Sequence, residues 1–158
     1  METVASILVV DDQLDILDNI GLALEAEGYR VLTATDGVEA LDVLQSQPVD
    51  LILADIAMPR MNGYQLCERV WKNPQWVAIP FVFLTARALD SDIRYGKALG
   101  VDDYLTKPIQ PEDLLAAVRG RLRRIIHVKP RSLYTQKSVH TNPDFNPEML
   151  SKNSNPDG

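Results

Sequence analysis

The sequence has little of what stabilises a secreted protein or anchors one in a membrane. Its single cysteine, Cys67, excludes an intrachain disulfide and favours a reducing compartment. The first residues carry no basic segment ahead of an apolar run, so they do not resemble a secretory signal. No apolar run approaches the roughly 20 residues that span a bilayer. We therefore expect a cytoplasmic protein that makes no membrane contact.

Positive charge is also scarce. The chain has 16 Lys and Arg against 22 Asp and Glu, a formal net charge of −6. Because nucleic acids are bound by surfaces with an excess of basic residues, we expect no direct nucleic-acid binding by this chain. The sequence also lacks a glycine-rich phosphate loop of the dinucleotide-binding or P-loop type. These absences exclude the commonest nucleotide-binding classes.

Short, continuously apolar runs alternate with segments of helical period along most of the chain. The runs cover residues 7–10, 31–34, 51–54, 81–84 and 104–105. Continuous apolar character is typical of strands that are covered on both faces, as in parallel sheets. Five repeats of strand and helix predict a doubly wound, flavodoxin-like α/β fold, a three-layer sandwich with strand order 2-1-3-4-5.

Local signals indicate where the helices begin and end. Gly28 is suited to end the first helix, and Asp36 is suited to cap the second. Asn62 can cap the third helix and Asp90 the fourth. Pro111 fits the first turn of a fifth helix, because proline lacks the N–H that is unpaired there in any case.

The character of the sequence changes near residue 126. Residues 1–126 carry the repeating pattern, and we expect them to form one domain. Residues 127–158 are rich in Pro, Ser and Asn and have no sustained period, which is typical of a linker or tail. Within them, residues 146–150 look like a helix start. Two interpretations stay open: a linker truncated before a further domain, and a short docking segment.

Three aspartates stand where two of the predicted strands end. Asp11 and Asp12 follow the run 7–10, and Asp55 follows the run 51–54. In the predicted order these two strands are neighbours, so the three carboxylates converge on the crevice where ligands of open α/β sheets bind. Carboxylates so close together repel one another unless a cation lies between them. Carboxylate, carbonyl and water oxygens are the ligands that Mg²⁺ prefers, and we expect a magnesium site.

The other two strands that reach this crevice end in residues suited to phosphate. Thr85 follows the run 81–84, and Lys107 follows the run 104–105 after one residue. A hydroxyl and an ammonium at the same edge would offer a hydrogen-bond donor and a positive charge to a transferring phosphoryl group. Together with the aspartates, they predict a site for carboxylate, cation and phosphate chemistry.

These residues resemble those of a known family. The sequence is similar to the response-regulator receiver domain of two-component phosphorelay signalling, the CheY-like domain, over roughly residues 5–125. The similarity rests on Asp11-Asp12, on residues 55–63 (DIAMPRMNG), on residues 84–86 (LTA) and on residues 102–108 (DDYLTKP). Each motif alone is weakly specific, but the ordered set at these spacings is strongly specific.

The resemblance implies a role for each acidic residue. Asp55 would accept a phosphoryl group from the phosphohistidine of a histidine kinase or phosphotransfer protein. Asp12 and Asp55 would bind Mg²⁺ directly, together with the backbone carbonyl of Ala57, and Asp11 would act largely through water. The domain would then be a phosphoacceptor switch, not an enzyme that turns over an external substrate.

The resemblance also implies how the switch works. Lys107 would pair with the acyl phosphate, its peptide bond to Pro108 would be cis, and Thr85 would move towards the phosphoryl group. Tyr104 would turn inward as Thr85 vacates space. The face formed by the fourth helix, the fifth strand and the fifth helix would then signal to an output domain or partner, with a homodimer through this face as one outcome.

Two further positions predict how long the phosphorylated state lasts. Ala57 stands two residues after the acceptor, and Arg87 stands two residues after Thr85. Neither offers a carboxylate or an amide to orient an attacking water, so we expect slow self-hydrolysis. Against the homodimer, Ile93, Ala98 and Ala117 stand where receivers of the winged-helix subgroup carry charged residues.

Two other classes of function stay open at this point. One is a hydrolase or phosphotransferase of the haloacid-dehalogenase type that uses Asp55 as a nucleophile on small phosphate esters. Such enzymes require a second acidic residue two positions after the nucleophile, where this chain has Ala57. The other is an interaction module with a degenerate site, which the retention of the full residue set disfavours.

Overall fold

The computed structural model describes residues 4–86 and 103–124. Its five strands are β1 (Ser6–Val10), β2 (Arg30–Ala34), β3 (Leu51–Asp55), β4 (Phe81–Thr85) and β5 (Asp103–Thr106). They form one sheet in the order β2-β1-β3-β4-β5, and every neighbouring pair is parallel. The predicted strand order is therefore confirmed.

Among the described residues, four helices connect or follow these strands. They are α1 (Leu14–Ala26), α2 (Gly37–Ser46), α3 (Gly63–Lys72) and α5 (Pro111–Arg124). The helix expected to begin at Asp90 lies outside the described residues, as do Arg87, Ile93 and Ala98. Within the described part of the chain, no helix combines the length and the apolarity needed to cross a bilayer.

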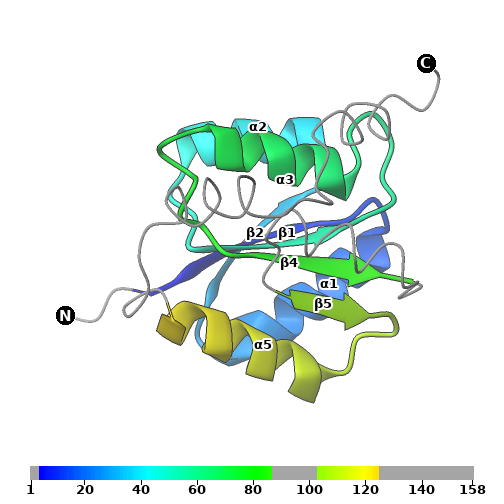
Figure 1. The fold of residues 1–158 in the computed structure, drawn as a ribbon. Coiled ribbons are helices and arrows are strands. Elements are labelled where there is room, and N and C mark those ends of the chain that lie inside the picture. Colours follow the sequence, from blue (N-terminus) through cyan, green and yellow to red (C-terminus); the bar gives the residue numbers. More distant parts are fainter. Residues whose placement is uncertain (1–3, 87–102, 125–158) are drawn as a thin grey trace, which may run out of the picture.

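The helices cover both faces of the sheet and create two apolar cores. Figure 1 shows α2 and α3 on one face and α1 and α5 on the other. Side chains alternate between the faces, so Leu8 and Val10 join the core under α2 and α3, whereas Ile7 and Val9 join the core under α1 and α5. The central strands are fully buried, as the continuous apolar runs predict.

The edge strand β2 departs from this expectation. Arg30 and Thr33 are exposed, Val31 and Leu32 are half-buried, and only Ala34 is buried. The strand lies at the end of the sheet, where the flanking helices cover it incompletely. The helices therefore bury both faces of the inner strands, but they leave β2 partly exposed.

The residues predicted to begin or end helices form the expected local hydrogen bonds. Gly28 has φ 92°, a left-handed conformation that glycine adopts without penalty, and the N–H groups of residues 28 and 29 donate to carbonyls of the last turn of α1. Asn62 caps α3 through a reciprocal capping box with Gln65. Asp36 caps α2 by accepting from the Glu39 N–H at 2.9 Å. These signals are confirmed because their partners lie within a few residues.

Candidate functional site

The carboxyl ends of the parallel strands carry the predicted site residues. Asp11 directly follows β1, Asp55 ends β3, Thr85 ends β4 and Lys107 directly follows β5. Because the strands are parallel and adjacent in the order β1-β3-β4-β5, these residues meet at one edge of the sheet. The structure thus brings together side chains that are as many as 96 positions apart in the sequence.

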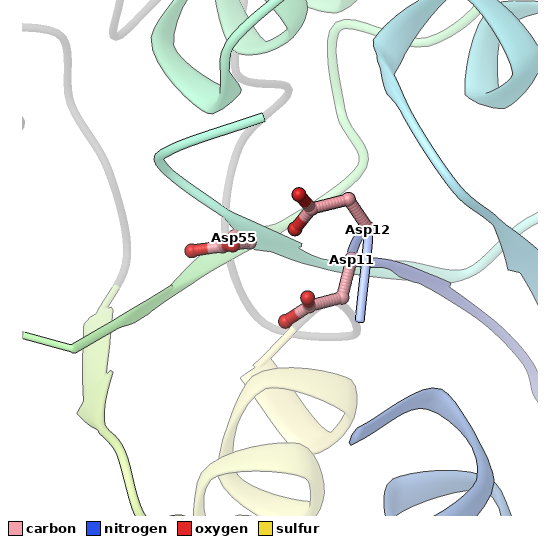
Figure 2. A group of neighbouring side chains, drawn as sticks. All are labelled: Asp11, Asp12 and Asp55. Atoms are coloured by element: carbon pink, nitrogen blue, oxygen red, sulfur yellow. The ribbon is translucent and has the colours of Figure 1, made fainter. Parts of the chain in front are cut away.

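Three carboxylates form a compact acidic cluster at this edge. One oxygen from each of Asp11, Asp12 and Asp55 lies within 4.8 Å of the other two. Figure 2 shows Asp11 and Asp12 at the end of β1 beside Asp55 on β3. Asp11 and Asp55 are buried and Asp12 is exposed, so the cluster is open to solvent on one side.

Asp11 is buried and held by two hydrogen bonds. Its backbone N–H donates to the Ala34 carbonyl at 3.1 Å, and its Oδ1 accepts from the Gln13 N–H at 2.9 Å. Its Oδ2 lies 2.8 Å from the ammonium of Lys107 but forms no well-oriented hydrogen bond with the described residues. A fully buried carboxylate oxygen in this condition has unused capacity to accept from a donor or to bind a cation.

Lys107 places the positive charge of the site between the acidic residues. Its ammonium is 2.8 Å from Asp11 Oδ2 and 3.4 Å from Asp55 Oδ2, and its side chain is only 12% exposed. Its backbone N–H donates to the Thr85 carbonyl at 2.7 Å, which ties β5 to β4 beside the site. The peptide bond between Lys107 and Pro108 is cis, the isomer that the family resemblance implies.

The surroundings of Asp55 disfavour its charged form. Burial, and then the neighbouring charge of Asp11, raise the pKa of the Asp55 carboxyl above its ordinary value. Lys107 and the backbone N–H of Ala57 act in the opposite direction without cancelling the increase. In the absence of a cation, the carboxylates are therefore held together against their mutual repulsion.

The two residues predicted to act as the switch lie close to this group. Thr85 is buried at the end of β4, next to the Lys107 backbone to which it is hydrogen-bonded. Tyr104 is half-buried, and its ring packs against Phe83 with centroids 5.6 Å apart. Phe83 also contacts the ring of Tyr64, so Tyr104 adjoins a row of aromatic side chains in the core. The switching motion itself stays a prediction.

Gln13 is a site residue that sequence reasoning missed. Its side-chain Oε1 accepts from the Lys107 ammonium at 3.3 Å, and its backbone N–H holds Asp11. Gln13 is the residue before α1, yet its side chain makes no capping hydrogen bond to that helix. Because Lys107 lies 94 positions away, no local sequence pattern could have revealed this contact.

The cluster fits a hard divalent cation. It supplies three carboxylate groups whose oxygens are close enough to share one ion, and one of these groups, Asp11, has a buried oxygen without a well-oriented donor. Ions of this type are bound by oxygen ligands and keep several water molecules, for which the exposed side at Asp12 leaves room. The acidic pocket can therefore hold a metal ion.

Comparison with known proteins identifies the family. The sequence model of the response regulator receiver domain matches residues 7–119. The chain is 43% identical over 129 residues to the transcriptional regulatory protein YvrH of Bacillus subtilis, which covers 81% of this chain and 53% of YvrH. It is 40% identical over 119 residues to the response regulator SaeR of Staphylococcus aureus, covering 75% of this chain and 51% of SaeR. The chain therefore spans about half the length of these curated relatives.

Solved structures agree with this result. The chemotaxis protein CheY4 of Vibrio cholerae has a TM-score of 0.72 at 35% identity, covering 75% of this chain and 98% of CheY4. A CheY-like receiver domain protein from Methanospirillum hungatei has a TM-score of 0.73 at 31% identity, covering 78% and 98%. These matches give no support to the hydrolase alternative. With the acidic cluster and Lys107 at the carboxyl edge of a CheY-like sheet, the chain belongs to the response regulator receiver domains of two-component systems.

Proposed function

We propose that Asp55 is the phosphoacceptor of this receiver domain and that a histidine kinase or phosphotransfer protein is the donor. The observation that carries this assignment is the position of Lys107, whose ammonium lies between Asp11 and Asp55 at 2.8 and 3.4 Å. A positive charge within reach of Asp55 can offset the charge of an anionic group that is transferred to this carboxylate.

The reaction is a transfer between two nucleophiles. A carboxylate oxygen of Asp55 attacks the phosphorus of the phosphohistidine, the phosphorus–nitrogen bond breaks, and the imidazole leaves with its electron pair. Lys107 is close enough to pair with the transferred group, and the buried Thr85 hydroxyl is expected to donate to it. The Ala57 N–H, which hydrogen-bonds Asp55, orients the attacking carboxylate.

We further propose that the cation of the site is Mg²⁺. Asp11, Asp12 and Asp55, with the backbone carbonyl of Ala57, would hold it, Asp11 largely through water. When bound, the ion supplies positive charge that offsets both the carboxylate repulsion and the charge of the phosphoryl group. Phosphorylation adds about −1.5 to −2 charges beside these carboxylates, so Lys107 and Thr85 must turn towards the new group to compensate.

The test is phosphorylation in the absence of any kinase. Incubation with acetyl phosphate and Mg²⁺, followed by intact mass spectrometry, is expected to add one phosphoryl group to the wild-type chain and none to Asp55→Ala. Asp42→Ala removes an exposed aspartate of α2 and is the matched control, which should be phosphorylated like the wild type. A stoichiometric mass gain in Asp55→Ala would overturn the assignment, and steady turnover of phosphomonoesters would indicate a hydrolase.

We expect the phosphorylated state to be long-lived, since the exposed residue Ala57, two positions after the acceptor, has only a methyl side chain and offers no carboxylate or amide to orient an attacking water. Loss of phosphoryl label from purified protein, without a phosphatase, measures the lifetime. Ala57→Asn introduces an amide that can orient water, and it is expected to shorten the lifetime. A wild-type half-life of seconds would contradict this expectation.

The output is proposed to pass through the face that includes β5 and α5, to an attached domain or a partner in the cytoplasm. The segment that matches this chain is only about half of each relative, which suits a receiver joined to an output domain through residues 127–158. A homodimer through this face is the less favoured outcome, because Asp103 is paired with Arg121 within the chain at 3.7 Å and Ala117 is buried. Light scattering before and after phosphorylation distinguishes the two.

A further inference from the structure

The loop that joins β3 to α3, residues 56–62, follows the phosphoacceptor and contains a tight turn. Arg60 has φ 64°, and the Met61 N–H donates to the Pro59 carbonyl at 2.6 Å, which closes a three-residue γ-turn. A residue with a Cβ is disfavoured at this φ because the Cβ crowds the backbone. Contacts elsewhere in the fold must therefore hold the turn in place.

An ion pair between the loop and α2 supplies the first of these contacts. Arg60 Nε and Nη2 both donate to Asp36 Oδ2, with Nε at 2.7 Å. The Asp36 side chain is 7% exposed and that of Arg60 is 61% exposed. The other oxygen of Asp36 accepts from the Glu39 N–H and caps α2. The two oxygens of one carboxylate are thus divided between the helix and the loop.

The packing of Met61 supplies the second contact. Met61 is buried, and a Cβ built at Gly37 would lie 2.8 Å from its side-chain atoms. Gly37 is the first residue of α2, directly after Asp36. Arg60 and Met61 of the loop therefore contact Asp36 and Gly37, respectively, at the start of α2.

The same junction also holds the opposite side of the acidic cluster. The Ala34 carbonyl, two positions before Asp36, accepts from the backbone N–H of Asp11. The segment 34–37 thus contacts both the residue that follows β1 and the loop that follows Asp55. This segment therefore links the loop after Asp55 to Asp11, which follows β1.

We propose that Arg60 and Asp36 are positioning residues for the phosphorylation site. Their ion pair holds the loop after Asp55, including Ala57, in the conformation that binds the divalent cation. Without the pair the disfavoured turn relaxes, and cation binding must then select a less populated conformation, which lowers the apparent affinity. This inference rests on the proposed function, because it concerns the cation and phosphoryl site of Asp55.

The variant Arg60→Ala distinguishes the positioning of the loop from the direct effect of the Arg60 charge on the bound cation. Removing a positive charge near an acidic cluster should by itself tighten Mg²⁺ binding, whereas loss of positioning should weaken it. We expect titration calorimetry with Mg²⁺ to give an affinity about threefold to tenfold lower, less than for a group that directly supports a metal ligand. The rate of phosphorylation by acetyl phosphate should fall in parallel.

Two further variants test the same pair from different sides. Arg60→Gly also removes the ion pair, but glycine adopts φ 64° without penalty, so its loss of affinity should be smaller than that of Arg60→Ala. Asp36→Asn keeps an oxygen to cap α2 but loses the charge that binds Arg60. The double variant of Arg60→Ala and Asp36→Asn should bind Mg²⁺ no more weakly than Arg60→Ala, because both changes remove one interaction.

Lys72→Ala is the matched control. It removes a positive charge and an ion pair, that of Lys72 with Glu68 at 2.8 Å on α3, without touching the loop. Its Mg²⁺ affinity should be no lower than that of the wild type. Urea unfolding of each variant verifies that it is folded.

The outcomes separate this inference from the proposed function. If Arg60→Ala and Asp36→Asn are less stable but bind Mg²⁺ and become phosphorylated like the wild type, the ion pair only stabilises the fold and the inference is wrong. If the wild type neither binds Mg²⁺ nor accepts phosphate, the proposed function is wrong and the inference fails with it.

Discussion

At the scale of single residues, the buried acceptor carries an energetic cost. Burial and the charge of Asp11 raise the pKa of Asp55 above its ordinary value of 3.8. A folded state that raises the pKa of an acid binds its proton more tightly than the unfolded chain does. Asp55 therefore contributes stability at pH values below 3.8, and this contribution is lost as pH rises through the raised pKa.

The first prediction is that Asp55→Asn stabilises the domain in the absence of divalent cations. The substitution keeps the shape of the side chain and removes the charge that burial and Asp11 disfavour. Urea unfolding in a chelator is expected to show a higher free energy of unfolding than the wild type at pH 7, with the gain shrinking as pH falls towards 4. A variant less stable than the wild type at pH 7 would show that Lys107 outweighs the repulsion.

The second prediction concerns Asp36, whose pKa shifts in the opposite direction. The Glu39 N–H, and then Arg60, hold the pKa of its carboxyl below 3.8 despite burial. Asp36 thus contributes stability above pH 3.8 that is lost as pH falls through the lowered pKa. Asp36→Asn should reduce the free energy of unfolding at pH 7 by about 1 kcal/mol, because Asn still caps but pairs weakly with Arg60. Equal stability at pH 7 would contradict it.

At the scale of elements, glycines decide how closely the site loop can approach its neighbours. Gly63 begins α3, its N–H donates to the Ile56 carbonyl at 2.8 Å, and a Cβ there would collide with the backbone of Asp55 and Ile56. At Gly120, within α5, an added Cβ would meet no atom of the described residues within 4 Å beyond its chain neighbours and the backbone of its own helix. The same substitution is therefore expected to have opposite effects in the two helices.

The third prediction compares these glycines. Gly63→Ala should lower the free energy of unfolding by about 1–3 kcal/mol, because backbone atoms cannot move aside. Gly120→Ala should raise it by about 0.5–1 kcal/mol, because alanine favours the helix and its methyl group meets no obstacle among the described residues. Urea unfolding of both variants under one condition provides the comparison. A neutral Gly63→Ala would mean that the loop after Asp55 can shift freely.

The helix ends show what local sequence can predict. Asn62, Asp36 and Gly28 act as expected because their hydrogen-bond partners lie within four residues. At α2, Asp36 and Glu39 stand at the spacing of a capping box, but the Glu39 carboxylate accepts from Thr35 and not from the N–H of the capping residue Asp36. Thr35 donates to Glu39 through both its N–H and its hydroxyl, and thus takes the place of the Asp36 N–H. The spacing of capping residues in the sequence does not reveal such a competing donor.

At the scale of the whole molecule, the site joins segments that only the folded sheet brings together. The fourth prediction is that Mg²⁺ raises the melting temperature of the wild type. A ligand that binds only the folded state stabilises it by about 1.4 kcal/mol when its free concentration is about tenfold above Kd, which corresponds to several degrees. Asp11→Asn should lose most of this response, while Asp42→Asn should keep it. An equal response in both variants would place the ion elsewhere.

The sequence by itself determined the strand order, the helix ends that were described, and the identity of the residues that gather at the carboxyl edge. It did so because apolar runs, capping residues and strand-end positions are local features, and parallel topology places strand ends at one edge. Asp11, Asp55, Thr85 and Lys107 lie where this reasoning predicted.

Only the tertiary structure decided which groups touch. It placed Gln13 on Lys107, paired Arg60 with Asp36, left β2 partly exposed, and raised the pKa of Asp55 through burial beside Asp11. These features depend on distances between segments far apart in the chain and on how completely each one is covered. Charge interactions and desolvation depend on distances in space and on burial, so they cannot be predicted from the pattern of neighbouring residues in the sequence.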